Sequence, residues 1–119
     1  MGTFAVKITV LNLDNPSRSA TVECLVDSWA AYSQLPSALL MSLGITHFDE
    51  RPAVLADGRR TLCRVGRVEF LYNERRTPAL VVFGDVGAPA LLGAMPLEGL
   101  GLGVDPIAKR LIPVDIPMA

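Results

Sequence analysis

Near its start the chain carries two short runs in which apolar and polar side chains alternate, at residues 4–10 and 19–26. A period of two is typical of a strand with one face on a core and the other toward solvent. Between the runs, residues 14–17 provide turn chemistry, so the two strands are expected to pair as a hairpin. The second strand ends at Val26 and places Asp27 at a strand terminus, where rigid scaffolds commonly present functional groups.

Turn signals predict further hairpins downstream. Asp57 and Gly58 form the dipeptide preferred in tight hairpin turns, and short apolar stretches flank them. The other elements expected are strands at residues 67–72, 78–83, 90–93 and 109–114 and helical turns at residues 37–43 and 95–100. The sequence therefore predicts an all-β, closed and mostly antiparallel fold with one or two short helices.

Length and charge restrict the kinds of partner. At 119 residues the chain has the size of one domain, and we expect a single domain over residues 1–119. Its 11 basic and 12 acidic side chains nearly cancel, which argues against nucleic acid or an anionic membrane as partner. Half of the residues are apolar, more than a small monomer easily hides, so a homodimer is plausible.

Other composition signals concern the compartment and metal sites. No secretory signal pattern is visible, and the uncharged stretch at residues 28–46 contains Pro36 and Gly44, so we expect it to be buried and not membranous. Cys24 and Cys63 make no disulfide framework, which favours reduced thiols and a cytoplasmic location. His47 is the sole histidine and has no neighbours at ligand spacing, so no metal or cofactor is expected.

Four motifs occur in an order and spacing that is informative about the family: ECLVDSWA at residues 23–30, QLP at 34–36, LADG at 55–58 and LLG at 91–93. This order resembles the retropepsin-like aspartic peptidases, and their small microbial relatives in particular. That family has an apolar strand ending in Asp-Thr/Ser-Gly-Ala, a flap hairpin, and a later apolar pair followed by Gly near a helix. The resemblance extends to about Val114 and implies the acid protease fold, a closed retropepsin-like β-barrel.

The resemblance implies an aspartic endopeptidase that needs no metal or cofactor. Asp27 would be the catalytic residue, because two carboxylates that share one proton can both activate water and protonate the peptide carbonyl. One such aspartate per chain requires a twofold homodimer, expected to form through the Asp27 loop and the chain termini. The substrate would be an extended peptide.

The family motifs also assign supporting roles. The active-site loop would comprise Ser28, Trp29 and Ala30, with the Ser28 hydroxyl bonding across the dimer axis. The flap that closes over the peptide would comprise Ala56, Asp57, Gly58 and Arg59.

Trp29 departs from the family pattern, which has Gly at this position. Gly is used where the backbone adopts conformations closed to other residues or approaches a ligand closely. An indole there is compatible with a blocked cleft, an interface or an aromatic wall for an altered substrate. The alternative function is therefore a catalytically silent dimerisation or peptide-binding module of the same fold.

The prediction that Asp27 is catalytic rests on the motifs around it, because an isolated aspartate at a strand end is ordinarily a turn residue or a cap. Asp85 begins a second string of this type at residues 85–88, but Val86 lacks the required hydroxyl and the LLG motif follows too soon. We interpret Asp85 as a loop residue.

Overall fold

The structure, a computed structural model, describes residues 4–55 and 57–118. Within them the chain is mostly β, with two short helices, as the sequence predicts. In chain order the elements are β1 (Ala5–Leu11), β2 (Ser19–Val26), β3 (Ser33–Pro36), α1 (Ser37–Ser42), β4 (His47–Val54), β5 (Arg60–Tyr72), β6 (Arg75–Gly84), β7 (Leu91–Leu92), α2 (Ala94–Leu100), β8 (Leu102–Asp105) and β9 (Arg110–Pro113). No helix in the described part of the chain is long and apolar enough to cross a membrane.

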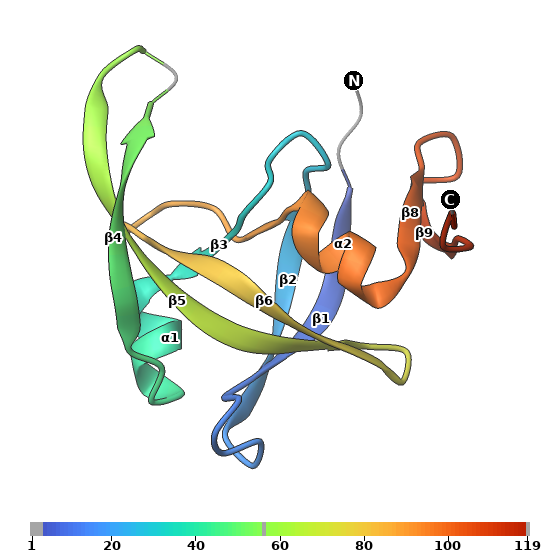
Figure 1. Cartoon of the computed structure of the whole chain (residues 1–119), viewed down its shortest axis with the longest axis horizontal. Helices are drawn as coiled ribbons and strands as arrows, with labels where there is room; N and C mark the ends of the chain where they lie inside the picture. The colour runs from blue at the N-terminus through green and yellow to red at the C-terminus, as the bar shows by residue number, and fades with distance from the viewer. Residues whose placement is uncertain (1–3, 56, 119) are drawn as a thin grey trace.

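Seven strands form one strongly curved sheet in the order β1-β2-β7-β3-β6-β5-β4. Since β1 also pairs with β5, the sheet curls back on itself into a barrel-like ring (Figure 1). The ring is not formally closed: β7 has two residues, and a single residue pair, Gln34 with Leu91, joins it to β3. The two remaining strands, β8 and β9, form a separate antiparallel hairpin.

The predicted first hairpin is confirmed. β1 and β2 pair antiparallel with Val6 opposite Cys24 and Ile8 opposite Val22, and the inward face of β1 carries buried Ile8 and Val10. The core collects the inward-facing side chains of the strands together with the apolar faces of both helices. Its most buried members are Ile8, Val10, Cys24, Leu35, Leu40, Val68, Phe70, Val81 and Leu92.

Some elements differ from the sequence prediction. The turn between β5 and β6 consists of Asn73 and Glu74, both with positive φ (46° and 70°); β5 ends at Tyr72 as predicted, whereas β6 begins at Arg75, three residues earlier than predicted. Two residues of positive φ give the twist that a two-residue hairpin requires. β3 and β8 were not predicted as strands: each has only four residues, and β3 in addition owes its pairing to distant β6 and β7, whereas β8 pairs with the next strand, β9.

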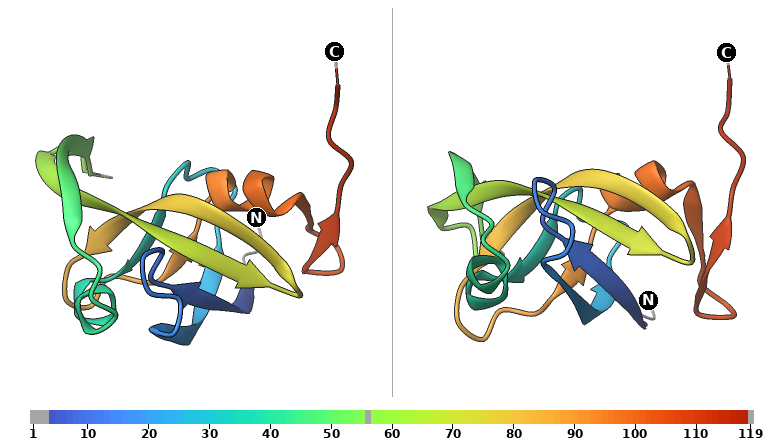
Figure 2. Two further views of the ribbon diagram at one scale, coloured as in Figure 1. Left: turned by 60° about the horizontal axis from the view of Figure 1, so that its bottom comes forward. Right: turned by 90° about the horizontal axis from the view of Figure 1, so that it is seen from below.

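Two segments project from the barrel. The hairpin of β4 and β5 rises on the same side as the loop that follows β2 (Figure 1). At the other end of the chain, the segment after β9 extends away from the body (Figure 2). It carries exposed apolar side chains at Val114, Ile116 and Met118.

The two thiols differ in burial and should differ in reactivity. Cys24 is fully buried, and burial raises its pKa to about 11, whereas Cys63 is half-buried at the base of the projecting hairpin. A pKa near 11 leaves roughly one thiol in a thousand ionised at pH 8, and the thiolate is the reactive form. At this pH iodoacetamide is expected to alkylate Cys63 and to spare Cys24 until urea unfolds the chain, as peptide mapping will measure. Equal labelling of both thiols in the native protein would contradict this assignment.

Candidate active site

Asp27 follows directly after β2, at the point where β2 and β7 run parallel. Leu25 lies opposite Leu91 and Val26 opposite Leu92, and the Asp27 N–H then donates to the Leu92 carbonyl at 2.9 Å. Two apolar strands from distant parts of the sequence therefore end side by side. Their shared edge holds the backbone of Asp27 in place.

The loop after Asp27 is a compact turn. The Asp27 carbonyl accepts a hydrogen bond from the Ala30 N–H at 3.2 Å, and Asp27 Oδ1 accepts one from the Trp29 N–H at 3.1 Å. The Asp27 side chain is half-buried, Ser28 and Trp29 are exposed, and Ala30 is half-buried. The turn thus fixes one carboxylate oxygen by a local hydrogen bond while the residue stays open to solvent.

Helix α2 holds this loop in place through the backbone N–H groups of its first turn. The N–H groups of Ala94 and Met95, which have no acceptor within the helix, donate to the carbonyls of Ala30 and Ala31 at 2.7 and 3.1 Å. The loop supplies the acceptors that a side-chain cap would otherwise provide, because Gly93 precedes the helix without one. Loop and helix therefore hold each other in register.

Gly93 sits where the loop and β7 come closest. Its N–H donates to the Ser33 hydroxyl at 3.0 Å, and Ser33 is fully buried. A Cβ at position 93 would lie 2.6 Å from the Tyr32 carbonyl oxygen and 2.8 Å from that of Ala30. Only glycine fits against this backbone. Sequence reasoning identified Gly93 as part of a motif but missed Ser33, which carries no signal beyond being a small polar residue before an apolar one.

Trp29 does not have a positive φ, so any L-residue can adopt its backbone conformation. Its side chain is 81% exposed. The backbone therefore imposes no demand for glycine at this position, and the indole stands on the surface next to Asp27 without filling the barrel.

The predicted flap is the tip of the β4–β5 hairpin. Ala56 lies outside the described residues; the others form a turn in which the Leu55 N–H donates to the Arg59 carbonyl at 2.7 Å and Gly58 has a φ of 87°. The Asp57 carboxylate accepts hydrogen bonds from the Arg59 N–H at 3.0 Å and from its guanidinium at 2.6 Å. These bonds, the backbone one first, lower the pKa of Asp57. Arg59 is thus paired within the turn.

A recess of about 190 Å³ lies between the segment after the Asp27 loop and the base of the flap hairpin. Its walls are mostly apolar, and they are formed by Tyr32, Arg51, Pro52, Ala53, Cys63, Val65 and Val82. None of these was predicted as a site residue, because the recess exists only where β4, β5 and β6 meet the loop.

Arg51 ties the flap hairpin to the loop region. It donates to the Tyr32 hydroxyl at 2.7 Å and to the Asp49 carboxylate at 2.8 Å. The hydrogen bond from Arg51 is the main cause that lowers the pKa of Asp49. Asp49 thereby balances the charge of Arg51, so the recess presents an apolar surface with a neutralised cation at its edge.

The other polar candidates do not join this site. Asp85 lies in the exposed loop after β6, as interpreted from the sequence, with its carbonyl accepting the Ala88 N–H. His47 begins β4 and packs edge-on against Phe83, with ring centroids 6.1 Å apart. Within the described ranges no group of three or more His, Cys, Asp and Glu residues is placed to hold a metal ion.

A barrel-like β-sheet, a projecting hairpin and an aspartate held beside a parallel strand pair define the retropepsin-like fold. Solved structures bear this out. EIAV protease in complex with an inhibitor superposes with a TM-score of 0.55 at 18% identity, covering 84% of this chain and 89% of that one. A retropepsin-like aspartic protease from Rickettsia conorii gives 0.53 at 19% identity, covering 87% and 77%. The predicted fold is therefore confirmed over most of the chain.

Sequence comparison adds a local match. No family model matches the chain. A curated NAD(P)H-hydrate epimerase from Nitrosopumilus maritimus is 38% identical over 55 residues, which are 46% of this chain and 25% of that protein. The chain thus spans about a quarter of the length of the curated relative that it matches.

Proposed function

We propose that the chain is one subunit of a homodimeric aspartic endopeptidase. The observation that carries the proposal is the placement of Asp27 at the end of β2, with its N–H bonded to the Leu92 carbonyl and its side chain only half-buried. This placement sits within a fold shared with two solved aspartic proteases. The retropepsin-like neighbours support the reaction class, and the chain's own loop supplies the residue.

In the proposed mechanism, Asp27 and the partner's Asp27 face each other across a twofold axis. Two carboxylates at close range cannot both ionise comfortably, so they share a proton and titrate as a pair. The ionised member takes a proton from water, and the water oxygen attacks the peptide carbonyl carbon. The protonated member donates its proton to the carbonyl oxygen, giving a tetrahedral diol. The diol collapses when the first aspartate passes the proton that it took from water to the amide nitrogen and the second aspartate takes a proton from a diol hydroxyl, so the C–N bond breaks, the amine leaves and the shared proton is restored.

The surrounding residues would bind and orient the peptide. The flap hairpin offers an extended backbone that can pair with the peptide as an added strand. The apolar recess beside Tyr32 and Ala53 would accept an uncharged side chain, because the charge of Arg51 is balanced by Asp49. The exposed apolar side chains of the segment after β9 would bury themselves in the dimer.

The test is peptide cleavage by the purified dimer. The protein is incubated with a diverse peptide library between acidic and neutral pH, with cleavage followed by mass spectrometry and oligomeric state by sedimentation. Cleavage at mildly acidic pH is expected, with inhibition by a peptide that carries a secondary alcohol in place of the scissile amide, a mimic of the tetrahedral diol. A folded dimer that cleaves nothing in the library would overturn the proposal.

The second candidate is a silent peptide-binding or dimerisation module, which the 81% exposed indole of Trp29 favours because a large exposed aromatic is typical of a binding surface. Trp29→Gly separates the two functions. On our proposal the parent cleaves peptides, and the variant stays folded and active with KM changed several-fold. Activity that is absent from the parent and appears in Trp29→Gly would instead establish a cleft blocked by the indole.

A further inference from the structure

A second cleft lies on the outside of the barrel, among the turn between β1 and β2, the segment after α1, and strand β5. Its volume is about 210 Å³, several times the roughly 30 Å³ share of one water molecule. The β1–β2 turn and α1 lie on the side of the molecule away from the loop after β2 (Figure 1). The lining residues are Asn12, Leu13, Asp14, Gly44, Ile45, Thr46, Phe48 and Arg67.

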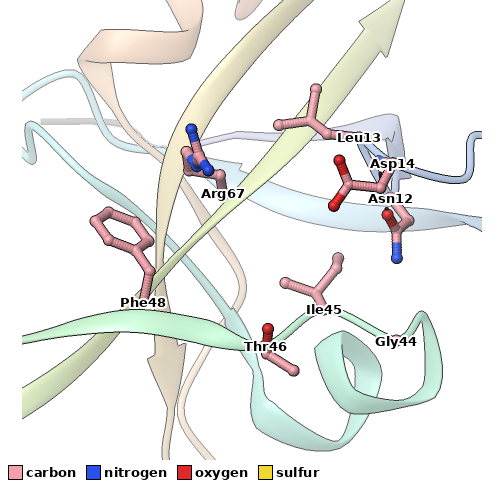
Figure 3. Close-up of a pocket in the computed structure, with 8 residues that line it drawn as sticks. All are labelled: Asn12, Leu13, Asp14, Gly44, Ile45, Thr46, Phe48 and Arg67. Atoms are coloured by element: carbon pink, nitrogen blue, oxygen red, sulfur yellow. Dashed lines mark hydrogen bonds between the residues drawn. The ribbon is translucent and has the colours of Figure 1, made fainter.

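Opposite charges face each other across this cleft. The carboxylate of Asp14 points into the cleft from one side, and Arg67 lies on the other side, next to Phe48 (Figure 3). Within the described part of the chain the two form no ion pair with each other or with any other residue. Four other arginines, by contrast, pair with carboxylates: Arg51, Arg59, Arg76 and Arg110. The cleft thus offers one cation and one anion to a ligand.

Both charged groups are held in position by their neighbours. Asn12 Oδ1 accepts hydrogen bonds from the N–H groups of Asp14 and Asn15 at 2.9 and 3.1 Å, and Asn12 Nδ2 donates to the Leu43 carbonyl at 2.9 Å. The turn that carries Asp14 is thereby tied to the segment after α1. On the other wall, the Arg67 guanidinium lies over the Phe48 ring, 5.5 Å from its centroid. A stacked guanidinium keeps its donors free for an anion.

Three apolar side chains contribute to the otherwise polar lining of the cleft. Ile45 is buried and Leu13 is half-buried, and Phe48 closes one end of the cleft. A cation on one wall, an anion on the other and apolar side chains beside them are complementary to a small zwitterion with a carboxylate, an ammonium and an aliphatic side chain on one carbon.

We propose that this cleft binds an aliphatic α-amino acid zwitterion, with the carboxylate on Arg67, the ammonium on Asp14 and the side chain over Ile45. Both contacts are charge-assisted hydrogen bonds, the stronger class in proteins. The site is distinct from the Asp27 loop and does not depend on the peptidase proposal.

The experiment titrates leucine into the isotope-labelled full chain and follows amide shifts by NMR. Saturable shifts are expected at residues 12–14, 44–48 and 67. N-acetylleucine removes the ammonium, and leucinamide removes the carboxylate. Each is expected to bind at least about tenfold more weakly than leucine, because a hydrogen bond to a charged group contributes about 1.5–3 kcal/mol. The dipeptide Leu-Leu tests whether the cleft binds a free amino acid or the end of a peptide. If Leu-Leu binds more weakly than leucine, the ligand is the free amino acid.

Matched variants assign the effect to the cleft. Asp14→Asn and Arg67→Gln are both exposed changes, expected to leave the fold intact and to weaken leucine binding about tenfold or more. Asp85→Asn and Arg60→Gln remove exposed charges of the same types elsewhere and are expected to bind leucine as the parent does. Leucine binding that survives both cleft variants, N-acetylleucine binding as tightly as leucine, or an absence of saturable shifts in the parent would each overturn the proposal.

Discussion

Replacement of Asp27 by Asn is expected to lower kcat/KM for peptide cleavage by about 10²–10⁴-fold, the range that positioned acid–base groups contribute. Asn has nearly the shape of Asp, and its amide oxygen can still accept the hydrogen bond that Asp27 Oδ1 accepts from the Trp29 N–H. It has no titratable proton, so neither proton transfer can occur. Initial rates on a peptide cleaved by the parent, with sedimentation to confirm the same oligomeric state, measure the effect.

Asp85→Asn is the matched control for this experiment. Asp85 also follows an apolar strand, β6, but it lies in an exposed loop. Its replacement is expected to leave kcat/KM unchanged within about twofold, since an exposed polar exchange away from the site has little effect. Cleavage that is equally fast in the Asp27→Asn variant would assign the activity to another residue or to a contaminant.

Gly93→Ala is expected to lower the free energy of unfolding by about 3 kcal/mol, the upper end of the usual cost of overpacking. The added Cβ would meet the Tyr32 carbonyl oxygen at 2.6 Å and that of Ala30 at 2.8 Å. These are backbone atoms, and the same stretch accepts the first N–H groups of α2, so it cannot move aside without breaking those bonds. Urea denaturation followed by far-UV circular dichroism measures the change.

Gly87→Ala provides the comparison for this stability effect. Gly87 has a positive φ of 84° but no atom within 4 Å of an added Cβ. Its replacement carries only backbone strain, about 1–2 kcal/mol. If Gly93→Ala lowers the free energy of unfolding no more than Gly87→Ala does, the interpretation that Gly93 packs closely against the Asp27 loop is wrong.

The sequence predicts those parts of the fold that depend on local information. The hairpin of β1 and β2 follows from alternation over 7 and 8 residues joined by a turn, and helix α2 follows from Pro96 near its start and glycines at its end. β3 is different, since its four residues become a strand through parallel pairing with β6, more than forty positions away. No property of those four residues predicts pairing with a strand so far away in the sequence.

The candidate site divides in the same way. Asp27 and Gly93 could be found because they stand in recognisable motifs at strand ends. The hydrogen bond from Arg51 to the Tyr32 hydroxyl, the buried Ser33 hydroxyl and the apolar recess depend on how distant segments meet in space. The backbone conformation of Trp29 could not be predicted either, because sequence alone does not give a φ angle.

The dependence of Asp27 on Leu92 has a consequence for the timing of biosynthesis. The acceptor for the Asp27 N–H, and the helix that binds the carbonyls of Ala30 and Ala31, belong to the last third of the chain. Contacts between such distant segments form late, because loop closure must precede them. A nascent chain that does not yet include residues 91–100 thus contains Asp27 but not the support that fixes it. The Asp27 loop therefore reaches its final geometry only after β7 and α2 have been synthesised and have packed against it.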